Sequence, residues 1–282
     1  MNFAEIPVVF SCAEEAMVGI VALPAQHGSC GVVIVVGGPQ CRTGSHRQFT
    51  LLARTLANHG IPSIRFDYRG MGDSDGEMRT FETVNEDVKL AADTLLKHVP
   101  GITETVLWGL CDGASASLLY ANKDKRVTGL VLVNPWVRTP ETLAKAEIRH
   151  YYKGRLTSVA FWKKLFTGHV NLVSSLKDGL RSLYGAFGHT EKVARADASM
   201  TLPQKMLQCA SAFRGRVLLL QSGQDLTARE FDDLLRSDDG WKLWAGGHLV
   251  TRVDIPDADH TFSEPACLAR AEAETISWVQ SC

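Results

Sequence analysis

A cysteine framed by two glycines is the clearest chemical feature of the sequence. Residues 108–113 read Trp-Gly-Leu-Cys-Asp-Gly, with Cys111 between Gly109 and Gly113. An apolar run precedes them and a helix-like segment, 114–120, follows. Because glycine has no Cβ, these positions allow a sharp strand-to-helix turn that exposes the central side chain. Backbone N–H groups at the start of the helix favour negative charge, so the pattern predicts a nucleophilic Cys111.

Two residues later in the chain favour this interpretation over a small cysteine packed under a helix. Asp225 lies in the turn that leaves the apolar run 216–221, and His260 lies in the loop that leaves the run 249–255. Catalytic groups collect at the carboxyl ends of the strands in open α/β sheets. The order Cys, Asp, His therefore predicts a catalytic triad of Cys111, Asp225 and His260.

The loop that follows the first buried apolar run is predicted to complete the site. The run 31–36 is almost wholly hydrophobic, as in a strand buried on both faces, and a glycine-rich loop, 37–46, follows it. Such a loop donates the second N–H of an oxyanion hole, and the first comes from Asp112, the residue after the nucleophile. Since Pro39 has no N–H, the donor is expected to be one of its neighbours: Gln40, which we favour, or Gly38 as the second choice.

Alternating strands and helices position these residues. Helix-like segments at 48–59 and 83–98 alternate with β-type runs such as 61–66, which predicts an α/β fold with a mostly parallel central sheet flanked by helices. A middle segment breaks the alternation and is rich in helix formers. The chain is thus expected to have three parts: an N-terminal part of the core (1–135), a helical cap insertion (136–210) and a C-terminal part of the core (211–282).

Several motifs resemble the α/β-hydrolase superfamily. Residues 66–74, Phe-Asp-Tyr-Arg-Gly-Met-Gly-Asp-Ser, are similar to its F-D-x-R-G-x-G-x-S turn, and 109–113 are similar to its nucleophile elbow, with Cys in place of the usual Ser. The resemblance covers most of the chain. It implies an α/β-hydrolase fold in which the insertion forms a cap over the active site. The cysteine departs from the usual pattern, so esterase activity is not simply inherited.

Four stretches also resemble one subgroup, the exosortase A system-associated hydrolases, which are found in bacteria beside exopolysaccharide and protein-sorting loci. They are Gly-Gly-Pro-Gln at 37–40, Gly-Ser-His-Arg-Gln-Phe at 44–49, the elbow at 108–113 and Asn-Pro-Trp-Val at 134–137. This resemblance implies a hydrolase or acyltransferase with a Cys-Asp-His triad.

Composition disfavours several classes of protein. The formal net charge of −1 argues against non-specific binding to nucleic acid. No apolar stretch is long enough to span a membrane, and residues 1–24 lack the pattern of a signal peptide. The seven cysteines are scattered and lack a C-x-x-C pair, which favours reduced cytoplasmic thiols and no zinc site. We expect a cytoplasmic protein without metal or cofactor, and the sequence leaves its oligomeric state open.

The first part of the predicted cap is strongly basic. It contains only two acidic residues, Glu141 and Glu147, between Arg138 and Lys164. A solvated helix face is the simpler interpretation, and the alternative is a docking surface for an anionic carrier, such as the phosphates of a pantetheine thioester, or for a membrane. The basic residues are Arg138, Lys145, Arg149, Lys153, Arg155, Lys163 and Lys164.

Together the motifs predict acyl chemistry through a thioester. Cys111 would attack a small-molecule acyl substrate, free or carrier-linked, as a thiolate paired with His260, while Asp225 fixes the orientation of the imidazole. Transfer of the acyl group to water makes the protein a hydrolase of esters, thioesters or lactones. Transfer to an alcohol or amine makes it an acyltransferase. A non-catalytic binding protein is a third alternative, which the complete triad disfavours.

The motif also predicts that Cys111 is the most reactive of the seven thiols. A limiting dose of iodoacetamide near neutral pH is expected to alkylate Cys111 first, as determined by peptide mass mapping. Cys41 is the main competitor because it lies in the loop of the predicted oxyanion hole. Faster alkylation of Cys41 or of Cys282 would contradict the assignment of the nucleophile.

Overall fold

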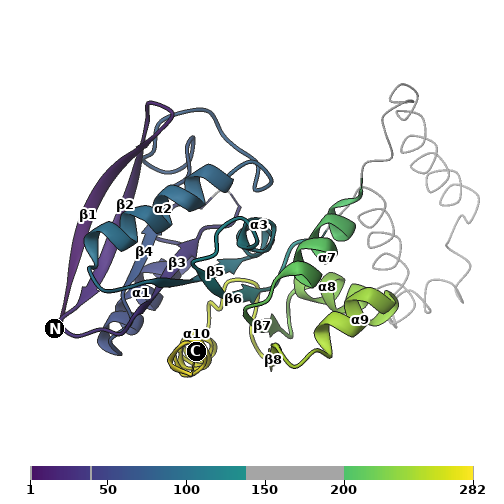
Figure 1. The fold of residues 1–282 in the computed structure, drawn as a ribbon. Coiled ribbons are helices and arrows are strands. Elements are labelled where there is room, and N and C mark those ends of the chain that lie inside the picture. Colours follow the sequence, from purple (N-terminus) through teal and green to yellow (C-terminus); the bar gives the residue numbers. More distant parts are fainter. Residues whose placement is uncertain (1, 39, 138–199, 282) are drawn as a thin grey trace, which may run out of the picture. The chain divides into compact units, whose positions relative to one another are not determined.

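The computed structural model describes residues 2–38, 40–137 and 200–281 (Figure 1). The described strands are β1 (Phe3–Cys12), β2 (Glu15–Pro24), β3 (Cys30–Val35), β4 (Ser63–Phe66), β5 (Glu104–Leu110), β6 (Val127–Val133), β7 (Arg216–Ser222) and β8 (Val250–Ile255). The described helices are α1 (Gln48–Asn58), α2 (Asn85–His98), α3 (Asp112–Ala121), α7 (Leu202–Ala212), α8 (Leu226–Ser237), α9 (Asp239–Ala245) and α10 (Pro265–Gln280), with a short 3-10 turn, η1 (Ser45–Arg47).

The described strands form one sheet of eight strands in the order β1-β2-β4-β3-β5-β6-β7-β8. Strands β4, β3, β5, β6, β7 and β8 pair in parallel, and β2 pairs antiparallel with both β1 and β4. This arrangement confirms the predicted α/β-hydrolase fold, with a mostly parallel sheet flanked by helices. The parallel pairing brings the carboxyl ends of β3, β5, β6, β7 and β8 to one edge of the sheet, where the predicted site residues follow.

The β1–β2 hairpin is an element that the sequence motifs did not predict. Its strands pair in register from Phe3 opposite Pro24 to Cys12 opposite Glu15. The two residues of its turn, Ala13 and Glu14, both have positive φ, at 49° and 71°. Such two-residue turns usually contain Asn and Gly, which tolerate positive φ. The turn therefore carries no sequence signal, and pairing along the strands stabilises it instead.

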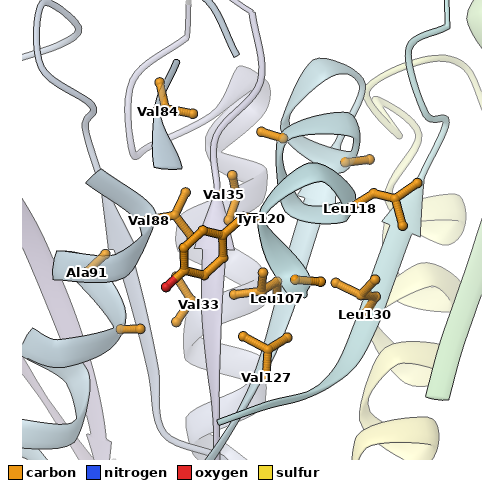
Figure 2. Close-up of a cluster of buried hydrophobic side chains, with 14 of the residues drawn as sticks. Val33, Val35, Val84, Val88, Ala91, Leu107, Leu118, Tyr120, Val127 and Leu130 are labelled. Atoms are coloured by element: carbon orange, nitrogen blue, oxygen red, sulfur yellow. The ribbon is translucent and has the colours of Figure 1, made fainter. Parts of the chain in front are cut away.

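Alternate residues of the central strands face two separate hydrophobic cores. In β3, Val33 and Val35 belong to the core under α2 and α3 (Figure 2), whereas Val32 and Ile34 belong to the core under α1 and α10. All four are completely buried. A strand covered by helices on both faces has no polar side, which explains the unbroken apolar run in the sequence.

The last part of the predicted insertion, residues 200–210, lies in the described structure. The described residues up to Val137 and from Leu202 onward form one compact unit with the sheet. Helix α7, which the sequence analysis placed in the insertion, belongs to this unit, and its Met206 and Ala210 are buried in the same core as α3. Most of the predicted helical cap (136–210), including its whole basic cluster, lies at 138–199, outside the described residues, and stays a prediction.

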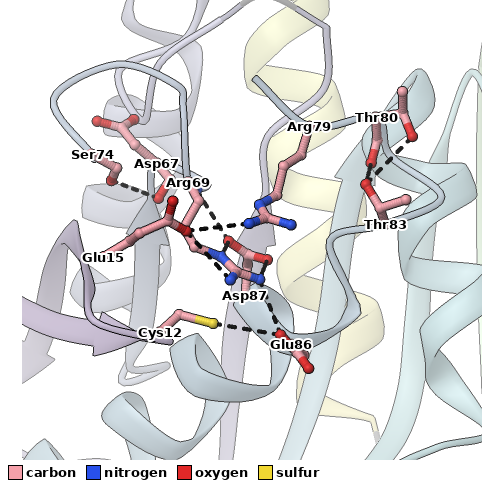
Figure 3. A network of polar contacts seen from close by, with 10 residues as sticks. All are labelled: Cys12, Glu15, Asp67, Arg69, Ser74, Arg79, Thr80, Thr83, Glu86 and Asp87. Carbon is pink, nitrogen blue, oxygen red and sulfur yellow. Dashed lines mark hydrogen bonds and ion pairs between the residues drawn. The ribbon is translucent and has the colours of Figure 1, made fainter. Parts of the chain in front are cut away.

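A buried arginine fixes the turn after β4 (Figure 3). Arg69 donates from Nε to Oδ1 of Asp87 at 3.0 Å and from Nη2 to Oδ2 at 2.9 Å, and neither side chain is more than 3% exposed. Glu86 and Glu15 lie on the same guanidinium at 3.2 and 3.5 Å. These bonds raise the pKa of Arg69, with Asp87 as the largest cause. The pair ties the Phe-Asp-Tyr-Arg-Gly turn to α2.

In the part of the chain that the structure describes, no helix combines the length and the hydrophobicity needed to cross a membrane.

The Arg69–Asp87 pair generates a stability prediction. Substitution Asp87→Asn keeps the side-chain volume but removes a buried counter-charge, and we expect it to lower the free energy of unfolding by about 3–5 kcal/mol. Lys89→Ala on the same helix is the matched control, because its ion pair with Asp93 is exposed and such pairs contribute about 0–1 kcal/mol. Urea unfolding monitored by circular dichroism measures both. Equal effects of the two substitutions would contradict the role given to Asp87.

Candidate active site

Cys111 occupies a strained turn between β5 and α3. Its backbone has φ 60° and ψ −124°, in a region that residues other than glycine seldom adopt. The turn is held by hydrogen bonds on both sides, because Cys111 N donates to Val133 O at 2.9 Å and Trp136 N donates to Cys111 O at 3.2 Å. The neighbouring strand β6 and the segment after it thus fix the conformation that the turn requires.

The two glycines of the motif are required by close packing. A Cβ on Gly109 would lie 2.3 Å from the carbonyl oxygen of Gly113, and a Cβ on Gly113 would lie 2.4 Å from the carbonyl oxygen of Val35. Either contact is shorter than any van der Waals separation. The local geometry expected from the sequence, a turn that accepts only glycine at both positions, is therefore present.

His260 connects Cys111 with Asp225. The Nδ1–H of His260 donates to Oδ2 of Asp225 at 2.8 Å, and Cys111 lies close enough to the imidazole to raise its pKa. Asp225 is the largest cause of a raised pKa of His260, from 6.5 to about 10, and the nearby Cys111 raises it further. The structure thus brings together all three residues that the sequence predicts as catalytic, in contact through the imidazole.

The carboxylate of Asp225 is held in place independently of its contact with His260. It caps the N-terminus of α8 and accepts hydrogen bonds from Thr227 N at 3.2 Å and from Ala228 N at 3.0 Å. Burial by itself raises the pKa of Asp225, but the hydrogen bond and charge of His260 and the N–H groups of Ala228 and Thr227 together outweigh burial and leave the pKa below its ordinary value. The carboxylate therefore stays charged and orients the ring of His260. Asp259, the other acid near this histidine, instead accepts from Ser263.

The predicted oxyanion-hole residues lie in two different settings. The N–H of Gly38 donates to the side chain of Asp112, the first residue of α3, so these two lie directly beside the elbow. The side chain of Gln40 accepts from Ser45 N at 3.3 Å and from Gln48 Nε2 at 3.5 Å, which ties it to the start of α1.

Asn134 is a site residue to which the sequence analysis gave no role. It is completely buried, has φ 47°, and bridges the ends of β6 and β7. Its Nδ2 donates to Ser222 Oγ at 2.9 Å and to the carbonyl oxygen of His260 at 3.4 Å, and its Oδ1 accepts from Ser222 N at 2.9 Å. The Asn-Pro pair directly after the apolar run 127–133 was the sequence signal for this residue, but its hydrogen-bond partners are distant in sequence.

Cys41 is a thiol whose pKa is lowered. Hydrogen bonds from the Thr43 side chain and the backbone N–H of Thr43 lower the pKa of the Cys41 thiol, so it remains a competitor for alkylation. Within residues 2–38, 40–137 and 200–281, no cluster of three or more His, Cys, Asp or Glu side chains is suited to hold a metal ion.

Comparison with known proteins places the chain in a family. Residues 29–229 match the model of a hydrolase family described as serine aminopeptidase, S33. The chain belongs to this family. The α/β-hydrolase superfamily and the hydrolase class that the sequence predicts are thereby confirmed.

Individual relatives are more distant. The monoglyceride lipase of Mus musculus is 24% identical over 236 residues, which are 74% of this chain and 73% of the lipase. The polyketide transferase grgF of Penicillium sp. is 36% identical over 90 residues, so the match covers only 30% of this chain and 31% of the transferase.

Solved structures confirm the same fold. An esterase from Pyrococcus furiosus superposes with a TM-score of 0.65 at 14% identity, covering 99% of this chain and 91% of the esterase. The structure of GrgF from Penicillium sp. superposes with a TM-score of 0.60 at 17% identity, covering 97% and 98% of the two chains. At these identities the similarity establishes the fold alone.

The Asp225–His260 contact predicts a change in titration. Asn still caps α8, but Asp225→Asn removes the largest cause of the raised pKa, so the pKa of His260 is expected to fall from about 10 toward 6.5. NMR of the imidazole C–H protons measures it. Asp259→Asn is the control and should leave the pKa unchanged.

The same shift has a consequence for stability. Because the pKa of His260 is higher in the folded protein than in the unfolded chain, the charged imidazole stabilises the fold. This contribution is complete below pH 6.5 and is lost as the pH rises toward 10. The free energy of unfolding of the unsubstituted protein should fall more steeply over this range than that of Asp225→Asn. Parallel curves for the two proteins would contradict the assignment of Asp225.

Proposed function

We propose that the protein is an acyl hydrolase that cleaves esters or thioesters through a cysteine-bound acyl intermediate. The observation that carries the proposal is the position of His260, which hydrogen-bonds to Asp225 and lies near the thiol of Cys111 at a strained strand–helix turn. Membership of a hydrolase family supports the reaction class. The catalytic assignment of the three residues, the subgroup resemblance and the bacterial, cytoplasmic setting are parts of the proposal.

The reaction has two halves. The sulfur of Cys111, with its proton on His260, forms a bond to the acyl carbon, and the bond from that carbon to the leaving oxygen or sulfur breaks. The imidazolium gives its proton to the leaving group, which departs as an alcohol or thiol. His260 then takes a proton from water as the water attacks the thioester, and returns it to the sulfur as the acid leaves. Asp225 holds the ring in one orientation throughout.

The oxyanion of each tetrahedral intermediate needs two backbone donors. The N–H of Asp112 lies at the start of α3, directly after the nucleophile. For the second donor the contact between Gly38 N and the Asp112 side chain supports Gly38, because that N–H points at the start of α3. This reverses the order of preference given from sequence, in which Gln40 came first. One such donor is typically worth about 2.7–4 kcal/mol of transition-state stabilisation.

Acyl transfer is the second candidate function. The 90-residue match to a polyketide transferase at 36% identity supports it, as does the nucleophile, because a thioester intermediate reacts with amines and alcohols as well as with water. The two candidates share the first half-reaction and differ only in the acceptor of the second.

Intact-mass spectrometry of the acid-quenched enzyme tests the proposal. Mixed with p-nitrophenyl esters and pantetheine thioesters of the same acyl groups, the enzyme is expected to gain one acyl group on Cys111 within the first turnover. Cys111→Ala should lose both the adduct and turnover, whereas Cys41→Ala, the control for a second reactive thiol, should keep them. Free acid and acyl-acceptor products, measured in the same samples, distinguish hydrolysis from transfer.

The nature of the adduct provides a further check. A thioester is cleaved by neutral hydroxylamine, while an acyl-serine ester is not, so Cys111→Ser should change the sensitivity of any adduct it forms. Turnover that persists in Cys111→Ala, or an adduct that maps to another residue, would overturn the proposal.

A further inference from the structure

The side chain of Asp112 lies among backbone donors at the elbow. Its carboxylate accepts a hydrogen bond from the N–H of Gly38, and the nearby N–H groups of Gly113 and of Asp112 itself lower its pKa. Gly37 leaves space for it, because a Cβ at that position would lie 2.6 Å from Oδ1 of Asp112. Donors from the loop after β3 and from the first turn of α3 thus converge on one carboxylate.

Two of these donors are the ones that the proposed mechanism requires for the oxyanion. The inference therefore rests on the proposed function. The N–H groups of Gly38 and Asp112 already interact with an anion that belongs to the protein itself. Two negative charges a few ångströms apart repel each other strongly in a half-buried site. A tetrahedral oxyanion and the carboxylate of Asp112 cannot share these donors.

The carboxylate is only moderately stable in this position. Burial raises the pKa of Asp112. The backbone N–H groups of Gly38, Gly113 and Asp112 and the charge of His260 lower this pKa, but they do not cancel the effect of burial. The other titratable neighbour is Tyr68, whose hydroxyl donates to Val36 O and whose pKa is raised by burial and by Asp112. Tyr68 therefore does not donate to this carboxylate, and the positive charge that stabilises it is that of His260.

We propose that Asp112 is a specificity-determining residue whose carboxylate fills the oxyanion hole of the resting enzyme and must be displaced by the incoming acyl group. On displacement the carboxylate moves away from these backbone N–H groups and into the space beside Cys111. Acyl groups without a negative charge near the carbonyl tolerate this. Acyl groups with a carboxylate near the reacting carbon are repelled, so the site is built for neutral or cationic acyl groups.

Alkylation of Cys111 tests the occupancy of the hole without any turnover. Iodoacetamide and iodoacetate have the same reacting carbon, but only iodoacetate carries a charge. The ratio of their rate constants, iodoacetate over iodoacetamide, is expected to rise at least tenfold in Asp112→Ala, which empties the donors. In Asp112→Asn the amide oxygen still occupies the donors without a charge, so a smaller rise is expected. Asp239→Ala removes one charge from α9, where that side chain is 98% exposed, and should leave the ratio unchanged.

The outcomes separate occupancy from simple charge repulsion. Equal increases in Asp112→Ala and Asp112→Asn would mean that only the charge matters and would overturn the proposal. An unchanged ratio in both variants would overturn it as well. Thermal melting of each variant verifies that the elbow is folded when the rates are compared.

Turnover of neutral esters provides the second arm. Asp112→Ala is expected to raise kcat/KM for a p-nitrophenyl ester of a short neutral acid severalfold, because no side chain has to leave the hole. A loss of more than tenfold in both Asp112 variants, with unchanged melting temperature, would overturn the proposal and show that the side chain of Asp112 supports turnover instead of obstructing it. If the unsubstituted enzyme turns over no ester or thioester, the proposed function fails, while the alkylation ratios still decide the position of Asp112.

Discussion

The chain must turn from β5 into α3 within a few residues, and the rest of the site depends on this turn. Cys111 is held at positive φ, where a Cβ is disfavoured, and the flanking Gly109 and Gly113 approach other backbone atoms so closely that no side chain fits there. The hydrogen bonds to Val133 and Trp136 maintain the strain. In return the thiol stands at the sheet edge beside the first N–H groups of a helix, where negative charge is stabilised.

The buried side-chain amide of Asn134 connects the central strands to the site. Asn134 joins the end of β6 to Ser222 at the end of β7 and to the backbone of His260 in the loop after β8. The same segment reaches the elbow, because Trp136 N donates to Cys111 O. Cys111 and His260 are therefore supported by the same segment, which neither residue's own loop provides. Buried, fully hydrogen-bonded polar side chains of this kind fix a single geometry.

Charge at the site is organised around one imidazole. Asp225 holds a low pKa against its own burial because His260 donates to it, and the pKa of His260 is raised in return. Asp112 adds a second carboxylate nearby, stabilised by backbone N–H groups more than by the charge of His260. In the proposed mechanism a cationic His260 beside Cys111 suits a thiolate nucleophile, which needs its charge before the attack, more closely than it suits a hydroxyl.

The sequence alone determined the βαβ alternation, the two-sided burial of β3 and the glycine-framed cysteine, because each depends on short-range patterns of hydrophobicity or on the missing Cβ of glycine. It also placed Asp225 and His260 at the ends of strands. Only the tertiary structure decided that α7 belongs with the sheet, that Ala13 and Glu14 form a hairpin turn, that Asn134 supports His260, and that Asp112 meets Gly38. Those contacts join residues whose partners are set by strand order and packing, which no local pattern in the sequence records.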